Sequence, residues 1–132
     1  MKANIITEKE LEIFLSDALL RIGGNACLNG FEYIIDAVKC LLRRPQEYIF
    51  KELYPEVAKL NNAKAANVER NIRNAIECIW NRGKGEEINK LFGVKLYSPK
   101  EKPANGHFLM LLTECAAKEF YYDGDTLVHV RR

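Results

Sequence analysis

The sequence lacks the cysteine and histidine spacing that metal sites and disulfide frameworks require. Its four cysteines are widely spaced, with no CxxC pair and no histidine close to any of them. Cys40 and Cys78 fall within apolar helical patterns, where we expect buried thiols. His107 and His129 are isolated in the sequence, with no serine, cysteine or acidic constellation around them. We therefore expect no metal site, no cofactor and no enzymatic activity.

Long apolar runs and an N-terminal leader are also missing. No stretch approaches the length of a membrane span, and residues 1–7 are too short for a signal peptide and lead into an acidic helical pattern. We therefore expect a cytoplasmic protein with no membrane partner. A chain of 132 residues that is 48% hydrophobic and 29% charged fits one globular domain, 1–132, with its own hydrophobic core.

A strong excess of one charge is absent, because the formal net charge is only +2. The cations are nevertheless concentrated between residues 64 and 84, a segment with five basic and two acidic residues. The basic residues there are Lys64, Arg70, Arg73, Arg82 and Lys84. A local cluster of this kind is typical of a surface that binds nucleic acid.

The same region contains a strongly amphipathic helical pattern, which we expect to run from about residue 64 to 81. Its apolar residues recur at steps of three and four: Val68, Ile72, Ala75, Ile76 and Ile79. The opposite side carries arginine and asparagine. A second helical pattern precedes it, separated by the Asn61-Asn62 break. A helix, a tight turn and a helix with a basic front predict a helix-turn-helix that binds DNA.

The rest of the chain predicts a mainly α fold, a bundle of about six helices with a small C-terminal β-hairpin. The 45–60 pattern should kink or break near Tyr54, because Pro55 has no amide hydrogen to donate, and a short helix should restart at Pro55. Asn105 should cap the last helix. The hairpin should surround the Asp123-Gly124 turn and pair with 94–97. The other expected helices are 7–21, 29–43, 86–92 and 106–118.

Four segments resemble a known family in their order and spacing. They are LYPEVAK at 53–59, NVERNIRNAIECIWNRG at 67–83, LFG at 91–93 and KPAN at 102–105. Together they resemble the C-terminal DNA-binding domain of stage zero sporulation protein A, the sporulation response regulator. The resemblance covers about 19–118, and the tail 119–132 lies outside it.

The resemblance implies an all-helical effector domain in which the second helix of a helix-turn-helix binds the major groove. In that family the target is a short element with a TGTCGAA core, and domains bind tandem elements head to tail. The region that contacts the sigma subunit of RNA polymerase corresponds to about 83–96. Glu69, Arg70 and Arg73 match family residues on the DNA-facing helix.

Several positions depart from the family pattern. Asn67 stands where the family has arginine, and Asn74 where it commonly has histidine. Ala63 and Lys64 replace hydroxyl residues, which leaves Asn62 or a backbone group to cap the helix. Because arginine suits guanine and asparagine suits adenine, we expect a shifted or relaxed target sequence. The first twenty residues are too few for the family's receiver domain, so we expect no phosphorylation switch within this chain.

Two hypotheses follow. In the first, the protein is a sequence-specific transcription regulator that binds double-stranded DNA, as a monomer or as a head-to-tail dimer on DNA. In the second, it keeps the fold but binds a sigma subunit or a full-length regulator without specific DNA binding. Glu69 has two interpretations, a contact with cytosine N4 or an arginine, and a structural pair with Arg73. The predicted DNA-binding residues are Lys64, Asn67, Glu69, Arg70, Arg73, Asn74, Arg82 and Lys84, with Lys64, Arg82 and Lys84 assigned to phosphates.

Overall fold

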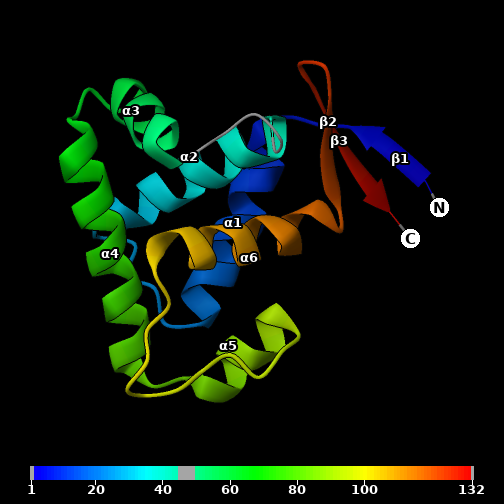
Figure 1. Cartoon of the computed structure of the whole chain (residues 1–132). Coiled ribbons are helices and arrows are strands. Elements are labelled where there is room, and N and C mark those ends of the chain that lie inside the picture. Colours follow the sequence, from blue (N-terminus) through cyan, green and yellow to red (C-terminus); the bar gives the residue numbers. More distant parts are fainter. Residues whose placement is uncertain (1, 45–49, 132) are drawn as a thin grey trace.

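A computed structural model describes residues 2–44 and 50–131. Within these residues the chain is mainly α-helical, with three short strands at its two ends (Figure 1). The predicted fold class, a bundle of six helices with a C-terminal hairpin, is confirmed. In chain order the elements are β1 (Lys2–Ile5), α1 (Glu8–Arg21), α2 (Asn29–Arg43), α3 (Phe50–Leu60), α4 (Ala65–Arg82), α5 (Gly85–Phe92), α6 (Asn105–Ala117), β2 (Phe120–Asp123) and β3 (Thr126–Arg131).

Helix α2 forms the centre of the packing, because α1, α3, α4 and α6 all contact it. Every residue of its apolar face is buried. One hydrophobic core joins this face to buried residues of the other helices and of the hairpin. The buried face of α2 comprises Phe31, Ile34, Ile35, Val38, Leu41 and Leu42.

Of the kink or break predicted near Tyr54, the break is wrong, because α3 continues through Pro55. A proline inside a helix costs about 3 kcal/mol relative to alanine. Leu53 and Val57, on either side of Pro55, are fully buried, and burying such a side chain contributes about 1.5–3 kcal/mol each. Tertiary packing on both sides therefore offsets the lost hydrogen bond. The earlier part of this prediction, 45–49, lies outside the described residues.

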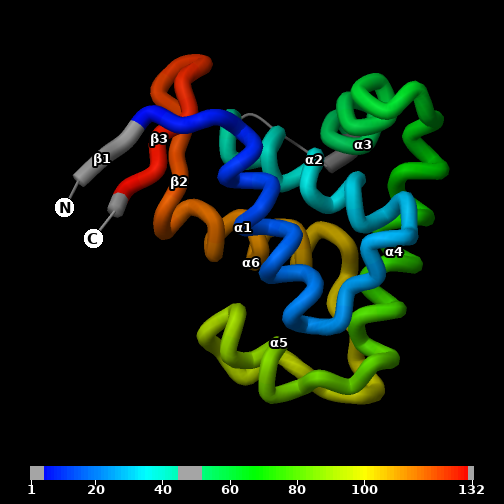
Figure 2. Tube along the Cα trace, turned by 180° about the vertical axis from the view of Figure 1, so that it is seen from behind, coloured from blue at the N-terminus to red at the C-terminus, as the bar shows by residue number. Residues whose placement is uncertain are grey.

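The predicted hairpin is confirmed, but its expected partner is wrong. The sheet has the order β1-β3-β2, and both pairs are antiparallel. The hairpin therefore pairs with Lys2–Ile5, with Ile5 opposite Val128, and not with 94–97. Figures 1 and 2 show the two chain ends side by side in this sheet. The segment 94–97 instead contacts α5 and α4. Asn89 Oδ1 on α5 accepts hydrogen bonds from the amides of Leu96 and Tyr97, and the Tyr97 hydroxyl bonds to α4.

The predicted side-chain caps are absent. Thr7 and Leu28 occupy the N-cap positions of α1 and α2 without side-chain cap bonds. Ala104 occupies that position in α6, so Asn105 is the first helical residue and not the cap. Its amide instead reaches across to α4. Helices α1, α2, α4, α5 and α6 begin within one residue of their predicted starts, although none of them has a side-chain cap hydrogen bond.

The cysteines follow the expectation in part. Cys40 is buried as predicted, whereas Cys78 is only partly buried. No group of three or more potential metal ligands lies together in the described parts of the chain. Across residues 2–44 and 50–131, no helix combines the length and apolar character needed to span a bilayer.

Candidate nucleic-acid interface

Helices α3 and α4 pack together and form the helix-turn-helix unit that the sequence predicted. The turn between them runs through Asn61, Asn62, Ala63 and Lys64. Asn62 has a φ of 52°, and the Ala63 amide donates to the Ala58 carbonyl at 2.8 Å. This is the hydrogen-bond pattern of a Schellman motif, in which a residue with left-handed backbone ends a helix.

Of the two caps expected for α4, Asn62 or a backbone group, the Asn62 side chain is not used. Lys64 occupies the N-cap position, with no side-chain hydrogen bond to the helix. Asn62 ends α3 rather than capping α4. No side-chain cap therefore bonds to the first amides of α4. Lys64 is exposed at this end of the helix.

The back of α4 holds the helix firmly in the core. Its predicted apolar stripe is confirmed, with Val68, Ile72 and Ile76 completely buried. This stripe packs against α2, α3 and α6. Gly30 of α2 lies so close to α4 that a Cβ atom there would be 2.0 Å from the Asn71 carbonyl oxygen. The close approach of α2 fixes which side of α4 faces outward.

The outward side carries the predicted DNA-binding residues. Glu69, Arg70, Arg73 and Asn74 are exposed, and Asn67 is half-buried. Arg70 Nη2 donates a hydrogen bond to Asn67 Oδ1 at 2.8 Å. These five residues therefore share the outward side of one helix.

The two arginines of this face are not neutralised by the protein itself. In residues 2–44 and 50–131, neither Arg70 nor Arg73 forms an ion pair with a carboxylate. The proposed structural pair of Glu69 with Arg73 is not formed in this part of the chain. By contrast, Arg44 pairs with Glu56 at 2.8 Å. The basic front of α4 is therefore available to an anionic partner.

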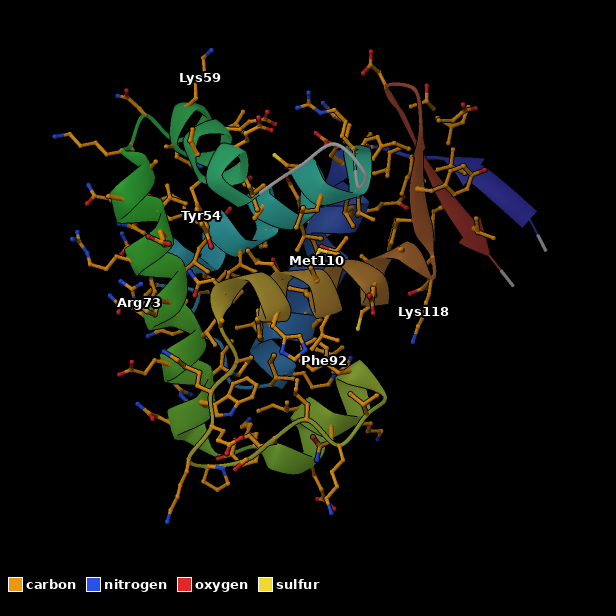
Figure 3. The ribbon with its side chains drawn as sticks, in the orientation of Figure 1. Tyr54, Lys59, Arg73, Phe92, Met110 and Lys118 are labelled. Carbon is orange, nitrogen blue, oxygen red and sulfur yellow. The ribbon has the colours of Figure 1, made fainter. Side chains whose placement is uncertain are left out.

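A shallow hollow lies beside this face, between α4 and the start of α6. Arg73 and Glu69 line it together with Tyr54 and the segment 102–106. Figure 3 shows Arg73 on α4 and Tyr54 on the neighbouring α3. Burial raises the pKa of the Tyr54 hydroxyl, and a side-chain hydrogen bond with Asn105 partly opposes this shift. Sequence reasoning did not select Tyr54 or Lys102, because they belong to other elements and meet α4 only in the tertiary structure.

The remaining predicted cations lie at the two ends of α4. Lys64 precedes the helix, and Arg82 and Lys84 are exposed at its far end. A helix of 18 residues is about 27 Å long at 1.5 Å per residue. These cations therefore do not form one cluster with Arg70 and Arg73, but flank them.

Tight packing orders the far end of α4. Gly83 ends the helix with a left-handed φ of 69°. Trp80 is buried and donates from Nε1 to the Ser98 carbonyl at 3.1 Å. The Tyr97 hydroxyl donates to the Trp80 carbonyl at 3.3 Å. Segment 94–98 thus anchors the end of the helix and positions Arg82 and Lys84.

A comparison with protein families bears on this arrangement. The family described as "Sporulation initiation factor Spo0A C terminal" matches residues 15–115. The match covers most of the 132 residues and includes all of α2, α3, α4 and α5. The strands β1, β2 and β3 lie outside it. The family is a DNA-binding domain of sporulation control, and the chain has its helix-turn-helix with an exposed basic helix. The chain therefore belongs to the Spo0A C-terminal family of DNA-binding regulatory domains.

Proposed function

We propose that the chain is a sequence-specific transcription regulator of sporulation control whose helix α4 enters the major groove of double-stranded DNA. The observation that carries this proposal is the front of α4. Its exposed Arg70 and Arg73 have no carboxylate ion pair in the described residues, while its back is fixed in the core. In helix-turn-helix proteins the second helix lies in the major groove, where exposed arginines that are not tied up by carboxylates can donate hydrogen bonds to base edges.

The side chains of this front match the hydrogen-bonding groups of base edges. Arg70 and Arg73 can each donate two hydrogen bonds to guanine O6 and N7. Glu69 can accept from cytosine N4 or orient a neighbouring arginine, and Asn74 can pair with adenine. The predicted shift in target sequence rests on these residue types and stays a prediction.

Phosphate contacts would come from the cations at the ends of α4. Lys64, Arg82 and Lys84 are exposed, and the two ends of the helix lie about 27 Å apart by the helical rise. Cations at both ends of a helix in the major groove can reach phosphates on both sides of that groove. Such contacts set the position of the helix without selecting a sequence.

The test is selection of duplexes from a randomised DNA pool by the purified protein. We expect one enriched sequence, and an affinity for it that falls steeply with salt because bound phosphates release counterions. A pool that stays random after repeated selection, or an affinity independent of salt, would contradict the proposal.

We further propose that the chain contacts the sigma subunit of RNA polymerase through 83–96 and that two copies bind tandem elements head to tail. The exposed Val94, at 52%, supports a protein contact in this segment. Val94→Asp should weaken capture of purified sigma subunit, whereas Ile13→Asp, a change at an equally exposed apolar residue on α1, should not. Retained capture by Val94→Asp would exclude this surface. The stoichiometry on duplexes with one or two elements tests the head-to-tail pair.

A further inference from the structure

We propose that Asn67 is a positioning residue, which holds the guanidinium of Arg70 for its contact with guanine and does not itself bind a base. This inference rests on the proposed function, because it assigns roles within the same DNA-binding face. It separates two residues that the sequence alone groups together, Asn67 and Asn74.

The geometry places the two side chains in direct contact. Asn67 and Arg70 are three residues apart on α4, and residues at this spacing are neighbours on a helix surface. Arg70 Nη2 donates to Asn67 Oδ1 at 2.8 Å, the usual distance for a bond to a charged donor. The bond consumes one N–H of the guanidinium and leaves the other donors free for a base edge.

The position of Asn67 itself is well defined. Its side chain is half-buried, whereas Arg70 is exposed. Its backbone carbonyl accepts a hydrogen bond from Asn71 Nδ2 at 2.7 Å. Asn67 is therefore the shorter and less exposed partner of the pair, and Arg70 is the longer, exposed side chain that the bond orients. An arginine on an exposed helix otherwise samples many rotamers, and holding one of them reduces the entropy that binding must remove.

The same bond disfavours a direct role for Asn67. An asparagine that recognises adenine accepts from N6 with its oxygen and donates to N7 with its amide. In this structure the oxygen of Asn67 already accepts from Arg70. Reading adenine would require Asn67 to turn away or to share that oxygen, and either change would loosen Arg70.

Asn74 provides a matched control on the same helix. It is exposed on the same face, and no side-chain hydrogen bond joins it to an arginine within residues 2–44 and 50–131. Replacing either asparagine with alanine removes the same amide from α4. Only the Asn67 change removes a partner of Arg70.

The experiment starts from the duplex that the wild-type protein selects. Each guanine of this duplex is replaced in turn with 7-deazaguanine, and the affinities for the modified and unmodified duplexes are compared. The modified base lacks the N7 acceptor that arginine uses. At one guanine we expect the replacement to lower the affinity of the wild-type protein by about ten-fold or more, and to leave the affinity of Arg70→Ala unchanged. At that guanine, the replacement should lower the affinity of Asn67→Ala less than it lowers the affinity of wild type. It should lower the affinity of Asn74→Ala as much as that of wild type.

A double-mutant cycle and a second variant complete the test. The Asn67→Ala and Arg70→Ala double variant should bind no more weakly than Arg70→Ala alone, because the two residues act as one unit. Asn67→Asp keeps an oxygen that accepts from Arg70 but has no amide to donate to adenine. It should therefore keep the 7-deazaguanine effect, although its added negative charge weakens binding to all duplexes alike.

The outcomes separate the inference from the proposed function. If Asn67→Ala keeps the full 7-deazaguanine effect, if the two changes are additive, or if no guanine shows the effect in wild type, the positioning role is wrong while DNA binding stands. Loss of the effect in Asn67→Asp would also overturn it, because the oxygen alone should suffice. If the wild-type protein selects no duplex, the proposed function itself fails.

Discussion

Asn105 Nδ2 on α6 donates a hydrogen bond to the backbone carbonyl of Glu69 on α4, at 3.0 Å. The two residues are 36 positions apart in the sequence. The bond attaches the start of α6 to the first half of α4.

Replacing Asn105 with alanine should lower the free energy of unfolding by about 0.5–1.5 kcal/mol, the net value of one hydrogen bond. We expect the lower end of this range, because the bond is exposed to solvent. Urea denaturation measures the change. Asn81→Ala is the control. Asn81 is exposed on α4, the helix that accepts the bond, and makes no side-chain hydrogen bond in the described residues. Equal effects of the two changes would show that the contact with Glu69 contributes nothing.

Arg73→Ala should weaken binding to the selected duplex by about 1–3 kcal/mol, the usual value of a base-contacting arginine. Discrimination against a base-substituted duplex should fall as well. Arg73 is exposed, so the melting temperature should stay close to that of wild type. Fluorescence titration measures the affinity, with Lys118→Ala as the control because Lys118 lies at the far end of α6 (Figure 3). Unchanged discrimination would remove Arg73 from the interface.

Lys64, Arg82 and Lys84 should behave differently from Arg73. Each alanine variant should weaken binding to selected and unrelated duplexes by a similar factor. Each should also reduce the slope of affinity against salt by about one, because one phosphate contact is lost. Titrations at several salt concentrations measure the slope. A variant with the wild-type slope would show that its cation does not contact a phosphate.

Tyr122 should make the stability depend on alkaline pH. Its hydroxyl donates a hydrogen bond to the Glu8 carboxylate, and the Arg43 guanidinium lies 4.8 Å from the centre of its ring. Burial, with a further contribution from Glu8, raises the pKa of Tyr122 from 10.0 to about 12. Between these values the unfolded chain has lost a proton that the folded chain still holds. The free energy of unfolding should therefore fall as pH rises from 10 toward 12.

Tyr122→Phe should reduce this loss of stability, because phenylalanine has no hydroxyl to ionise. Urea denaturation at neutral and alkaline pH compares the two proteins. Tyr121→Phe is the control, since Tyr121 is 46% exposed on the other face of the strand. The same alkaline slope in Tyr122→Phe and wild type would contradict the assignment.

The C-terminal hairpin should be part of the folded core although the family match ends at residue 115. Phe120 is 2% exposed and packs against Phe14 with 5.2 Å between ring centres. Phe120→Ala should lower the free energy of unfolding by about 3–5 kcal/mol. Tyr121→Ala, at the adjacent exposed position, should change it by no more than about 0.5 kcal/mol. Similar small effects of both changes would show that the hairpin is not required for stability.

Much of the secondary structure could be predicted because its signals are local. The buried stripe of α4 follows from apolar residues at steps of three and four, and the hairpin from β-branched residues around Asp123-Gly124. The contact of Arg70 with Asn67 also has the local spacing of three residues. The sequence did not predict the continuity of α3, since the burial of Leu53 and Val57 that offsets Pro55 depends on other helices.

The sequence by itself determined the six-helix pattern, the helix-turn-helix and the residue types on its exposed face, because each depends on neighbours within a few turns of the chain. The tertiary structure alone decided the partner of the hairpin, the role of Asn105 and the hollow beside Arg73. In the sheet, Lys2 of β1 lies opposite Arg131 of β3, almost the whole chain length away in sequence. No local pattern encodes this strand pairing. These features depend on packing between segments that are distant in sequence, so the energies that select them appear only when the whole core is assembled.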